Sequence, residues 1–558
     1  MSGRIRYRQP LPGRSLRCHG TVLRLTRRPN EVRWQLHRLG WWRAMGLAYR
    51  SSGDEKYARE WVFQFRDWAQ KNQLGKSPEN DRYAWRPLEA SERIQLFPAV
   101  FDLFIATPSV TPAFLLEFLN STSMHAEYVR MHYSKAGNHL LFEAQRILGM
   151  GAFLPELNKA ATWRKSGIEV LNREIHKQVF ADGVQWELSP IYHVAVIEIF
   201  VNAYNAAKSA GMAAEFPPSF VKTIEKMVEA AANMSFPDYN MPMFGDSWLV
   251  KKEDRIKQFK AWSKLFGNNA FIRYFASEGK EGAAPHYLSH ASKDAGFYTF
   301  RNGWNTQSTV MLMKASQPGE FHAQPDNGTF ELWVKGRNFT PDSGCYIYSG
   351  DANVTRMRDW YRQTRVHSTL TLNKQNMVIT QATQKKWAPG QDLDVFTFSN
   401  PSYAGLRHQR SVLFIKKKFF LILDQAIGSA TGEVAVHFQL RDDSKPVFNK
   451  QENRVHTSYA DGNNLLIHSL NKDVRTIEEE GKVSYFYNRE TARPAFMFEK
   501  AKADAATQVF ASVLYPFDGA HPPAITFREN AGNDILNGVI DLSIDIGGTR
   551  YEVRTRLE

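Results

Sequence analysis

The first half of the chain carries apolar residues at helical spacing. Tyr57, Trp61, Phe65 and Trp68 recur at positions i, i+4, i+8 and i+11, which places them on one face of an amphipathic helix. Similar runs continue to about residue 280, and Pro or Gly residues separate them with little strand signal between. The pattern predicts an all-α domain of stacked helical hairpins over residues 31–282.

From about residue 285 the period of the apolar positions changes to two, which is the period of β-strands. Residues 308–313 and 434–440 are examples, and turn sequences such as Asp461-Gly462-Asn463 separate these runs. Evenly spaced strands to the C-terminus predict a large antiparallel β-sandwich over residues 283–558. Two domains also agree with the length of 558 residues, because single cores stop growing near ~250–300 residues.

The charge balance is basic, with 71 Lys and Arg against 57 Asp and Glu, and it favours a polyanionic partner. The 14 Trp, 21 Tyr and 37 Phe suit a carbohydrate binder, because aromatic faces stack on sugar rings; large aromatic cores explain them equally well. The sequence contains no zinc-finger spacing, no RNP-like strand and no P-loop. We therefore expect no nucleic-acid partner.

Residues 1–30 form an atypical basic segment, with eight arginines in the first 28 residues. Arg and Pro interrupt it throughout, so it lacks the apolar region of a signal peptide. No run of 18 apolar residues occurs anywhere, and we expect no membrane insertion. The two cysteines, Cys18 and Cys345, exclude a disulfide framework and a Cys-based metal site.

A polar loop lies directly before the strand-like run 329–334 and contains His322, Gln324 and Asn327. Polar residues in a loop at the edge of a sheet indicate a functional site, because a rigid scaffold positions such loops. His322 is a candidate general acid or base, since an unperturbed imidazole titrates near ~6.5. A structural polar network is the alternative interpretation.

Two helix starts carry further candidates. Gly137 breaks one helix, and Asn138 fits the N-cap of the next. Ser189-Pro190 opens another helix and places Tyr192 in its first turn, where the helix dipole favours a negative charge and hence a phenolate. Each residue also has a structural interpretation, as a capping amide or as a core Tyr with its hydroxyl bound to the backbone.

Arg86 suits bidentate binding of a carboxylate or a sulfate. A buried brace between Arg86 and Glu89 is an equally good interpretation. Trp248 is a candidate for lining a sugar subsite, whereas its neighbour Asp246 is expected to be structural.

These four motifs, within helices followed by a sandwich, resemble the heparinase II/III-like polysaccharide lyases, most closely the heparinase III (heparan-sulfate lyase) branch. The resemblance covers roughly residues 31–558. It implies an incomplete (α/α) toroid followed by a large antiparallel β-sandwich, and a periplasmic or secreted location. It also implies an enzyme that cleaves an acidic glycosaminoglycan, heparan sulfate, by β-elimination at a uronate in glucuronate-rich regions.

The resemblance also implies roles for single residues. The family residue that matches Asn138 faces the substrate carboxylate, and the one that matches Tyr192 is the Brønsted residue of the elimination. His322 is the candidate partner of Tyr192, so helical domain and sandwich are expected to meet at the site. The candidate substrate-binding residues are His139, Arg86, Glu89, Trp248 and Asn327.

A metal site is a further implication. The related heparinase II branch has a His-Ala-His pattern with two metal-binding partners downstream, and here Gln324 replaces the second His. Gln is a harder and poorer zinc ligand than imidazole. We therefore expect at most one structural divalent cation, calcium or zinc, at Gln324, Asp342 and His367, and none in the chemistry.

Three other functions stay open at this point. The chain is consistent with a lyase for another uronate polymer such as alginate, and with a glycosaminoglycan-binding protein that has lost activity. A glycoside hydrolase with paired carboxylates fits less well, because nothing in the spacing singles out Glu187 and Asp326. The oligomeric state is not predicted.

Overall fold

The computed structural model describes residues 30–348 and 352–558. The basic segment over residues 1–28, with Cys18, lies outside the described residues. The chain divides into two compact units, one ending at His125 and one beginning at Ala126, and each is treated by itself.

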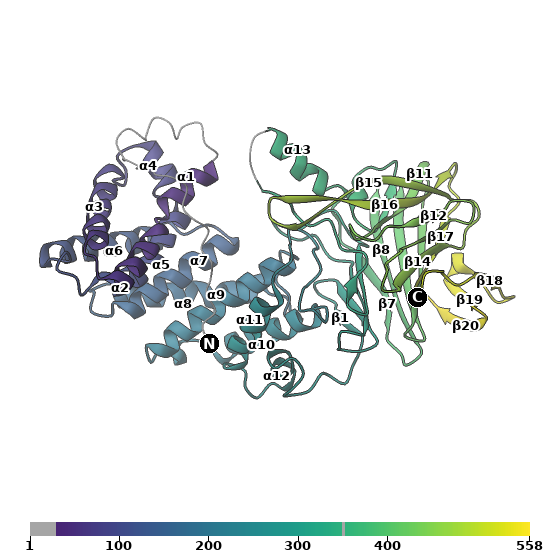
Figure 1. The fold of residues 1–558 in the computed structure, drawn as a ribbon, viewed down its shortest axis with the longest axis horizontal. Coiled ribbons are helices and arrows are strands. Elements are labelled where there is room, and N and C mark those ends of the chain that lie inside the picture. The colour runs from purple at the N-terminus through teal and green to yellow at the C-terminus, as the bar shows by residue number, and fades with distance from the viewer. Residues whose placement is uncertain (1–29, 349–351) are drawn as a thin grey trace. The chain divides into compact units, whose positions relative to one another are not determined.

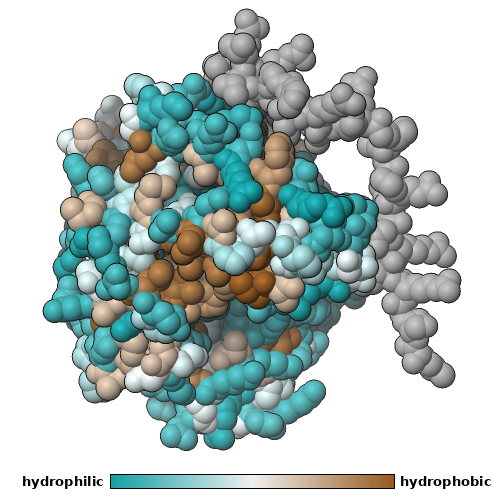
Figure 2. Space-filling view, turned by 90° about the vertical axis from the view of Figure 1, so that its left-hand side faces the viewer, coloured by the Kyte–Doolittle hydropathy of each residue, from teal (hydrophilic) through white to brown (hydrophobic). Residues whose placement is uncertain are grey.

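The first unit is helical and is built around aromatic side chains. Trp61 stacks on Phe104 with 4.7 Å between ring centroids, and both Trp61 and Phe65 of the predicted apolar face are buried. Figure 2 shows apolar side chains gathered on the face that this unit presents to the viewer. Its helices are α1 (Asn30–His37), α2 (Trp41–Ser52), α3 (Lys56–Lys71), α4 (Pro78–Tyr83), α5 (Pro87–Phe104) and most of α6 (Pro112–Met131).

The second unit begins with helices that pack closely against one another. A Cβ on Gly167 of α8 would lie 2.5 Å from the carbonyl oxygen of Ala144 in α7, so only glycine permits this close approach. The helices are α7 (Gly137–Phe153), α8 (Ala160–Gln178), α9 (Pro190–Ser209), α10 (Pro218–Asn233), α11 (Lys252–Ser263) and α12 (Ala270–Ala276). The predicted change from helices to strands is observed between α12 and β1 (Figure 1).

Four antiparallel sheets follow. A five-stranded sheet has the order β1-β2-β3-β4-β5, and a four-stranded sheet has the order β15-β16-β11-β6. Their strands are β1 (His290–Ser292), β2 (Phe297–Arg301), β3 (Thr309–Lys314), β4 (Phe330–Val334), β5 (Arg337–Asn338), β6 (Leu370–Leu372), β11 (Gly432–Gln439), β15 (Arg475–Phe486) and β16 (Arg489–Lys502).

An eight-stranded sheet, β12-β13-β14-β17-β10-β9-β8-β7, shares a core with both of these sheets. A three-stranded sheet, β18-β19-β20, packs against other side chains of the eight-stranded sheet and forms a second core with them. The strands are β7 (Thr383–Ala388), β8 (Leu393–Tyr403), β9 (Leu406–Ile415), β10 (Phe419–Ile427), β12 (Val447–Asn449), β13 (Arg454–His456), β14 (Asn463–Ser469), β17 (Gln508–Asp518), β18 (Ile525–Glu529), β19 (Val539–Ile546) and β20 (Thr549–Arg556).

The central strands are buried more completely than a strict alternation of apolar and polar residues indicates. Every residue of β3 and β4 is buried, as is nearly all of β9 and β10. Apolar and polar residues alternate along a strand when one face is exposed to water, and these strands are covered on both faces. The polar residues among them must therefore find hydrogen-bond partners inside the protein. No helix among the described residues is long and apolar enough to span a membrane.

Candidate active site

A hydrogen bond between His322 and Asp246 lies at the centre of the candidate site. His322 comes from the loop between β3 and β4, and Asp246 from the loop between α10 and α11. The Nδ1 atom of His322 lies 2.8 Å from Oδ2 of Asp246, and the Asp246 amide donates to the His322 carbonyl at 3.0 Å. A Cβ on Gly245, whose φ is 63°, would lie 2.7 Å from that carbonyl oxygen, so a glycine is required beside Asp246.

Asp246 is buried and accepts hydrogen bonds from three side chains. Besides His322, Gln324 Nε2 donates at 3.1 Å and Arg358 Nη2 at 2.8 Å. Burial alone would raise the pKa of Asp246, but the His322 hydrogen bond and the Arg358 charge outweigh it and hold the pKa below its ordinary value. An ionised Asp246 accepts only, so Nδ1 of His322 carries the hydrogen and the neutral ring presents Nε2 as an acceptor.

Tyr192 lies in the first turn of α9, as predicted, and its ring stacks on His322 with 3.7 Å between centroids and an interplanar angle of 8°. Its hydroxyl donates to the hydroxyl of Tyr348 at 2.9 Å. The expectation of a stabilised phenolate is wrong for this structure. Burial raises the pKa of Tyr192 above its ordinary value, and the charge of Asp246 adds to the increase, so the resting residue is a protonated phenol.

Asn138 lies beside the buried carboxyl group of Glu187. Helix α7 starts at Gly137 with Ala136 as its N-cap, so the prediction that Asn138 caps the helix is wrong. Its Nδ2 atom instead donates to Glu187 Oε2 at 2.9 Å, and its buried Oδ1 has no hydrogen-bond partner in the described part of the chain. Glu187 also lies 4.0 Å from Nε2 of His322. Burial raises the pKa of Glu187 to about 7 against the opposing effects of His322 and Asn138.

Two other predicted substrate-binding residues lie next to this cluster. The half-buried ring of Trp248 is 6.5 Å from the Tyr192 ring and 6.5 Å from the Tyr348 ring, centroid to centroid. His139 follows Asn138 on α7 and is exposed. Residues of the helical part and of the sandwich therefore meet within the second unit.

Three further predicted substrate-binding residues have polar partners within the protein. In the first unit Arg86 Nη2 donates to the buried Glu89 at 2.6 Å, and Arg38 pairs with the same carboxylate at 2.9 Å. These contacts form the buried brace that is the structural interpretation of Arg86 and Glu89. Asn327 is buried in the sandwich, where Oδ1 accepts from the Ser316 amide at 2.9 Å.

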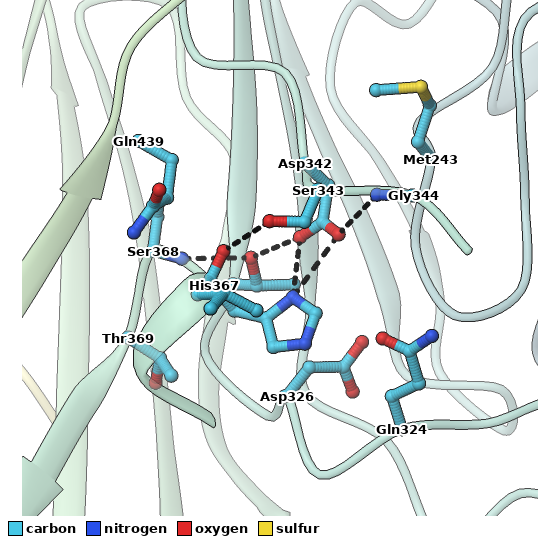
Figure 3. A network of polar contacts seen from close by, with 12 residues as sticks. Met243, Gln324, Asp326, Asp342, Ser343, Gly344, His367, Ser368, Thr369 and Gln439 are labelled. Carbon is cyan, nitrogen blue, oxygen red and sulfur yellow. Dashed lines mark hydrogen bonds and ion pairs between the residues drawn. The ribbon is translucent and has the colours of Figure 1, made fainter. Parts of the chain in front are cut away.

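The predicted metal ligands belong to a buried polar network (Figure 3). His367 Nδ1 lies 2.9 Å from Asp342 Oδ2. Gln324 and Asp326 lie on the other side of the imidazole, towards its Nε2 atom (Figure 3). Three buried atoms of this network lack a hydrogen-bond partner among the described residues, namely Gln324 Oε1, Asp326 Oδ2 and His367 Nε2. Across residues 30–348 and 352–558, no group of three or more His, Cys, Asp or Glu is placed to hold a metal ion.

Sequence reasoning missed four residues of the site: Glu187, Asp246, Tyr348 and Arg358. Asp246 and Glu187 stand in motifs that were recognised, but their roles depend on contacts with residues far along the chain. Tyr348 and Arg358, on or before α13 (Ala352–Tyr361), stand in no motif. No local pattern identifies them.

Helical hairpins joined to stacked antiparallel sheets, with a Tyr–His pair held by a buried carboxylate, define a two-part enzyme fold with an acid–base site. Two family models match the chain, "Heparinase II/III N-terminus" over residues 23–274 and "Heparinase II/III-like, C-terminal" over residues 284–524. The chain belongs to the heparinase II/III family.

Relatives and solved structures agree with this family. A heparin-sulfate lyase of Pedobacter heparinus is 59% identical over 525 residues, covering 94% of this chain and 80% of the relative. A heparin-sulfate lyase of Bacteroides stercoris is 42% identical over 549 residues, covering 95% and 82%. The crystal structure of heparan sulfate lyase HepC from Pedobacter heparinus matches with a TM-score of 0.81 at 58% identity, covering 95% of this chain and 84% of that one. A crystal structure of heparinase III matches with a TM-score of 0.88 at 28% identity, with the same coverage. The element order and these matches confirm the predicted fold class.

The raised pKa of Glu187 makes stability depend on pH. In the folded state Glu187 keeps its proton up to about pH 7. In the unfolded state its carboxyl group has the ordinary pKa of 4.5 and loses the proton at lower pH. The stability contributed by protonated Glu187 is fully present below pH 4.5, is lost progressively between pH 4.5 and about 7, and the full loss is on the order of 3 kcal/mol. We expect Glu187→Gln to melt higher than the parent at pH 8, with a smaller difference at pH 5.

The control is Glu320→Gln, the same change at an exposed carboxylate of the second unit. Melting curves at the two pH values provide the measurement. An equal difference for Glu187→Gln at both pH values would contradict the raised pKa.

Proposed function

We propose that this protein is a polysaccharide lyase that cleaves heparan sulfate by β-elimination at a uronate and releases unsaturated oligosaccharides. The observation that carries the proposal is the stacked Tyr192–His322 pair, fixed by Asp246 next to the amide of Asn138. The relatives are heparin-sulfate lyases at 59% and 42% identity over most of the chain. Alginate lyase activity and an inactive binding protein have no comparable support.

The elimination begins with the uronate carboxylate, whose charge must be neutralised before the C5 proton becomes acidic. Asn138 is suited to this role. One hydrogen of its amide is bound by Glu187, and the second is available for the substrate carboxylate. A protonated Glu187 adds no negative charge beside that carboxylate, and its pKa of about 7 keeps it protonated below neutral pH. Preorganised donors of this kind stabilise the developing enolate.

Proton transfer then needs a base and an acid. His322 fits the base, because Asp246 holds its Nδ1 hydrogen and leaves Nε2 to take the C5 proton. Tyr192 fits the acid, because burial keeps its phenol protonated until it gives the proton to the leaving C4 oxygen. A Tyr192 that serves as both base and acid, as the family resemblance implies, must first lose its own proton against this raised pKa.

The stacking of the two rings bears on the substrate. Rings 3.7 Å apart and nearly parallel hold the imidazole and the phenol together, so that one sugar ring can reach both groups. In glucuronate the C5 hydrogen and the C4 oxygen lie on one face of the sugar, so a single pair of neighbouring groups can serve both. The arrangement therefore suits glucuronate-rich chains, and the basic charge balance of the protein suits their acidic groups.

We also propose one structural divalent cation, calcium or zinc, in the network of Figure 3. Its support is the set of three buried acceptors without partners, one each on His367, Gln324 and Asp326. A cation at Nε2 of His367 would have Asp326 as its carboxylate ligand, with Asp342 fixing the ring from behind. Lys314 already pairs with one oxygen of Asp326 at 2.5 Å, so a cation would take the other oxygen, Oδ2. We expect the cation to stabilise the network and to take no part in the reaction. The periplasmic or secreted location stays a prediction.

The substrate assignment predicts a ranking. We expect the ultraviolet absorbance of unsaturated product to rise fastest with low-sulfate heparan sulfate, more slowly with heparin, and least with chondroitin sulfate, hyaluronan and alginate. Added salt should weaken substrate binding, because surface attraction is screened over roughly 8–10 Å. Faster product release from alginate than from heparan sulfate would overturn the choice of substrate.

Tyr192→Phe removes one hydroxyl and keeps the stacked ring. Loss of a positioned acid–base group lowers the rate typically ~10²–10⁴-fold, and the loss should fall on kcat more than on KM. His322→Ala should also be severe, and the double variant should lose less than the product of the two, because both residues act on one transition state. If the Tyr192→Phe enzyme keeps most of its turnover and a normal melting temperature, another residue must carry out the elimination.

Chelation separates a structural cation from a catalytic one. We expect a chelator to lower the melting temperature while the initial rate at low temperature changes little, and calcium or zinc to restore the melt. Elemental analysis gives the stoichiometry. If the protein holds no metal and melts identically with and without chelator, the proposed cation site is wrong.

A further inference from the structure

The tip of the long β15–β16 hairpin is bound to the two loops that line the candidate site. Figure 1 shows this hairpin extending beyond the other strands of its sheet. Near the tip the Leu249 amide donates to the Tyr485 carbonyl at 2.9 Å, and the Asn488 amide donates to the Tyr346 carbonyl at 2.7 Å. These bonds join the tip to the loop that carries Trp248 and to the segment that carries Tyr348. A segment remote in sequence therefore reaches the site in a fixed position.

Two adjacent aromatic residues at this tip have different surroundings. The Tyr487 ring lies 5.3 Å from the Tyr348 ring and 6.2 Å from the Trp248 ring, centroid to centroid, and its hydroxyl accepts from the Tyr348 amide at 3.2 Å. It nevertheless remains 44% exposed. Phe486 is 47% exposed, and no ring contact involves it within the described part of the chain.

A large ring that is both exposed and fixed is suited to binding. Tyr487 has few conformations left to lose when a ligand covers it, because two ring contacts and a hydrogen bond already hold it. The apolar face of a pyranose ring can stack on such a ring, and the Tyr487 hydroxyl lies at the polar end of the side chain.

The aromatic contacts also form a path that leads away from the chemistry. Trp248 contacts Tyr192, which stacks on His322, and Tyr487 contacts Trp248. Within the described part of the chain, Tyr487 has a ring contact with Trp248 but none with Tyr192 or His322. A polysaccharide whose reacting uronate lies against Tyr192 can therefore extend past Trp248 to Tyr487. The hairpin tip thus lies beyond the sugar that reacts.

We propose that Tyr487 is a sugar-binding residue that stacks on a pyranose ring of the acidic polysaccharide beyond the reacting uronate. This subsite makes longer chains bind more tightly than short ones. The inference rests on the proposed function, because it takes the polysaccharide as the ligand and Tyr192 as the reacting end of the path.

The test measures binding without turnover, in the full chain with Tyr192→Phe as the parent. Isothermal titration compares a heparan sulfate disaccharide and octasaccharide. We expect Tyr487→Ala to raise the Kd of the octasaccharide about five- to tenfold, as expected for the loss of one aromatic stacking contact. The Kd of the disaccharide should stay the same, because it does not reach the tip.

Two variants isolate the ring of Tyr487. Tyr487→Phe keeps the ring and loses the hydroxyl, and should leave the octasaccharide Kd within about twofold of the parent. Phe486→Ala removes an equally exposed ring from the same tip and should have no effect. With Tyr192 restored, Tyr487→Ala should raise the KM for the octasaccharide by more than it lowers kcat, since Tyr487 does not touch the reacting atoms.

The contrary outcomes are distinct. An unchanged octasaccharide Kd in Tyr487→Ala rejects the subsite, as does an equal loss in Tyr487→Phe. A lower kcat at unchanged Kd would mean that Tyr487 only positions Tyr348, and this also rejects the subsite. A parent that neither binds nor cleaves any heparan sulfate chain rejects the proposed function first, and this inference with it.

Discussion

The hydrogen bond from His322 to the buried carboxylate of Asp246 is the interaction on which the site depends. It joins the loop after β3 to the loop before α11, and so joins the sandwich to the helices. A buried carboxylate without partners is costly, and Asp246 is stable there because Arg358, Gln324 and His322 all donate to it. The same bonds fix the hydrogen of the imidazole on Nδ1. The fold thereby orients the group that takes the proton.

The sandwich holds these loops by further buried polar contacts. Arg410 of β9 pairs with Asp424 of β10, and its Nη1 donates to the carbonyl oxygens of Gly328 at 2.5 Å and Ser368 at 2.8 Å. Glu331 of β4 accepts from the Met243 amide at 2.6 Å, just before Asp246. Burial raises the pKa of Glu331 to about 8, so a neutral carboxyl group connects the sheet to that loop. Strands covered on both faces thus position the site through polar side chains that alternation alone would place outside.

Local sequence patterns predicted the features that depend on neighbouring residues in the chain. The helical and two-residue periods located the helices and strands, and Ser189-Pro190 placed Tyr192 in the first turn of α9. The N-cap prediction for Asn138 failed because Ala136 takes that position and Glu187, far along the chain, binds the amide.

The electrostatic predictions failed for a related reason. Burial raises the pKa of Tyr192 above its ordinary value, and burial is a property of the assembled fold. The structural role expected of Asp246 also could not anticipate His322, since the two residues lie 76 positions apart. Sequence motifs found the segments of the site, but they did not reveal which side chains face each other.

The turnover number of Asp246→Asn on heparan sulfate shows whether the bond between His322 and Asp246 orients the base. The substitution keeps the shape of the side chain but removes the acceptor that holds the hydrogen on Nδ1 of His322. We expect kcat to fall ~10²–10⁴-fold, as for loss of a correctly protonated base, with KM nearly unchanged and the melting curve still cooperative. Asp238→Asn is the control, since its carboxylate in the same loop binds Asn240 rather than His322. Turnover of Asp246→Asn close to that of the Asp238→Asn control would contradict the account.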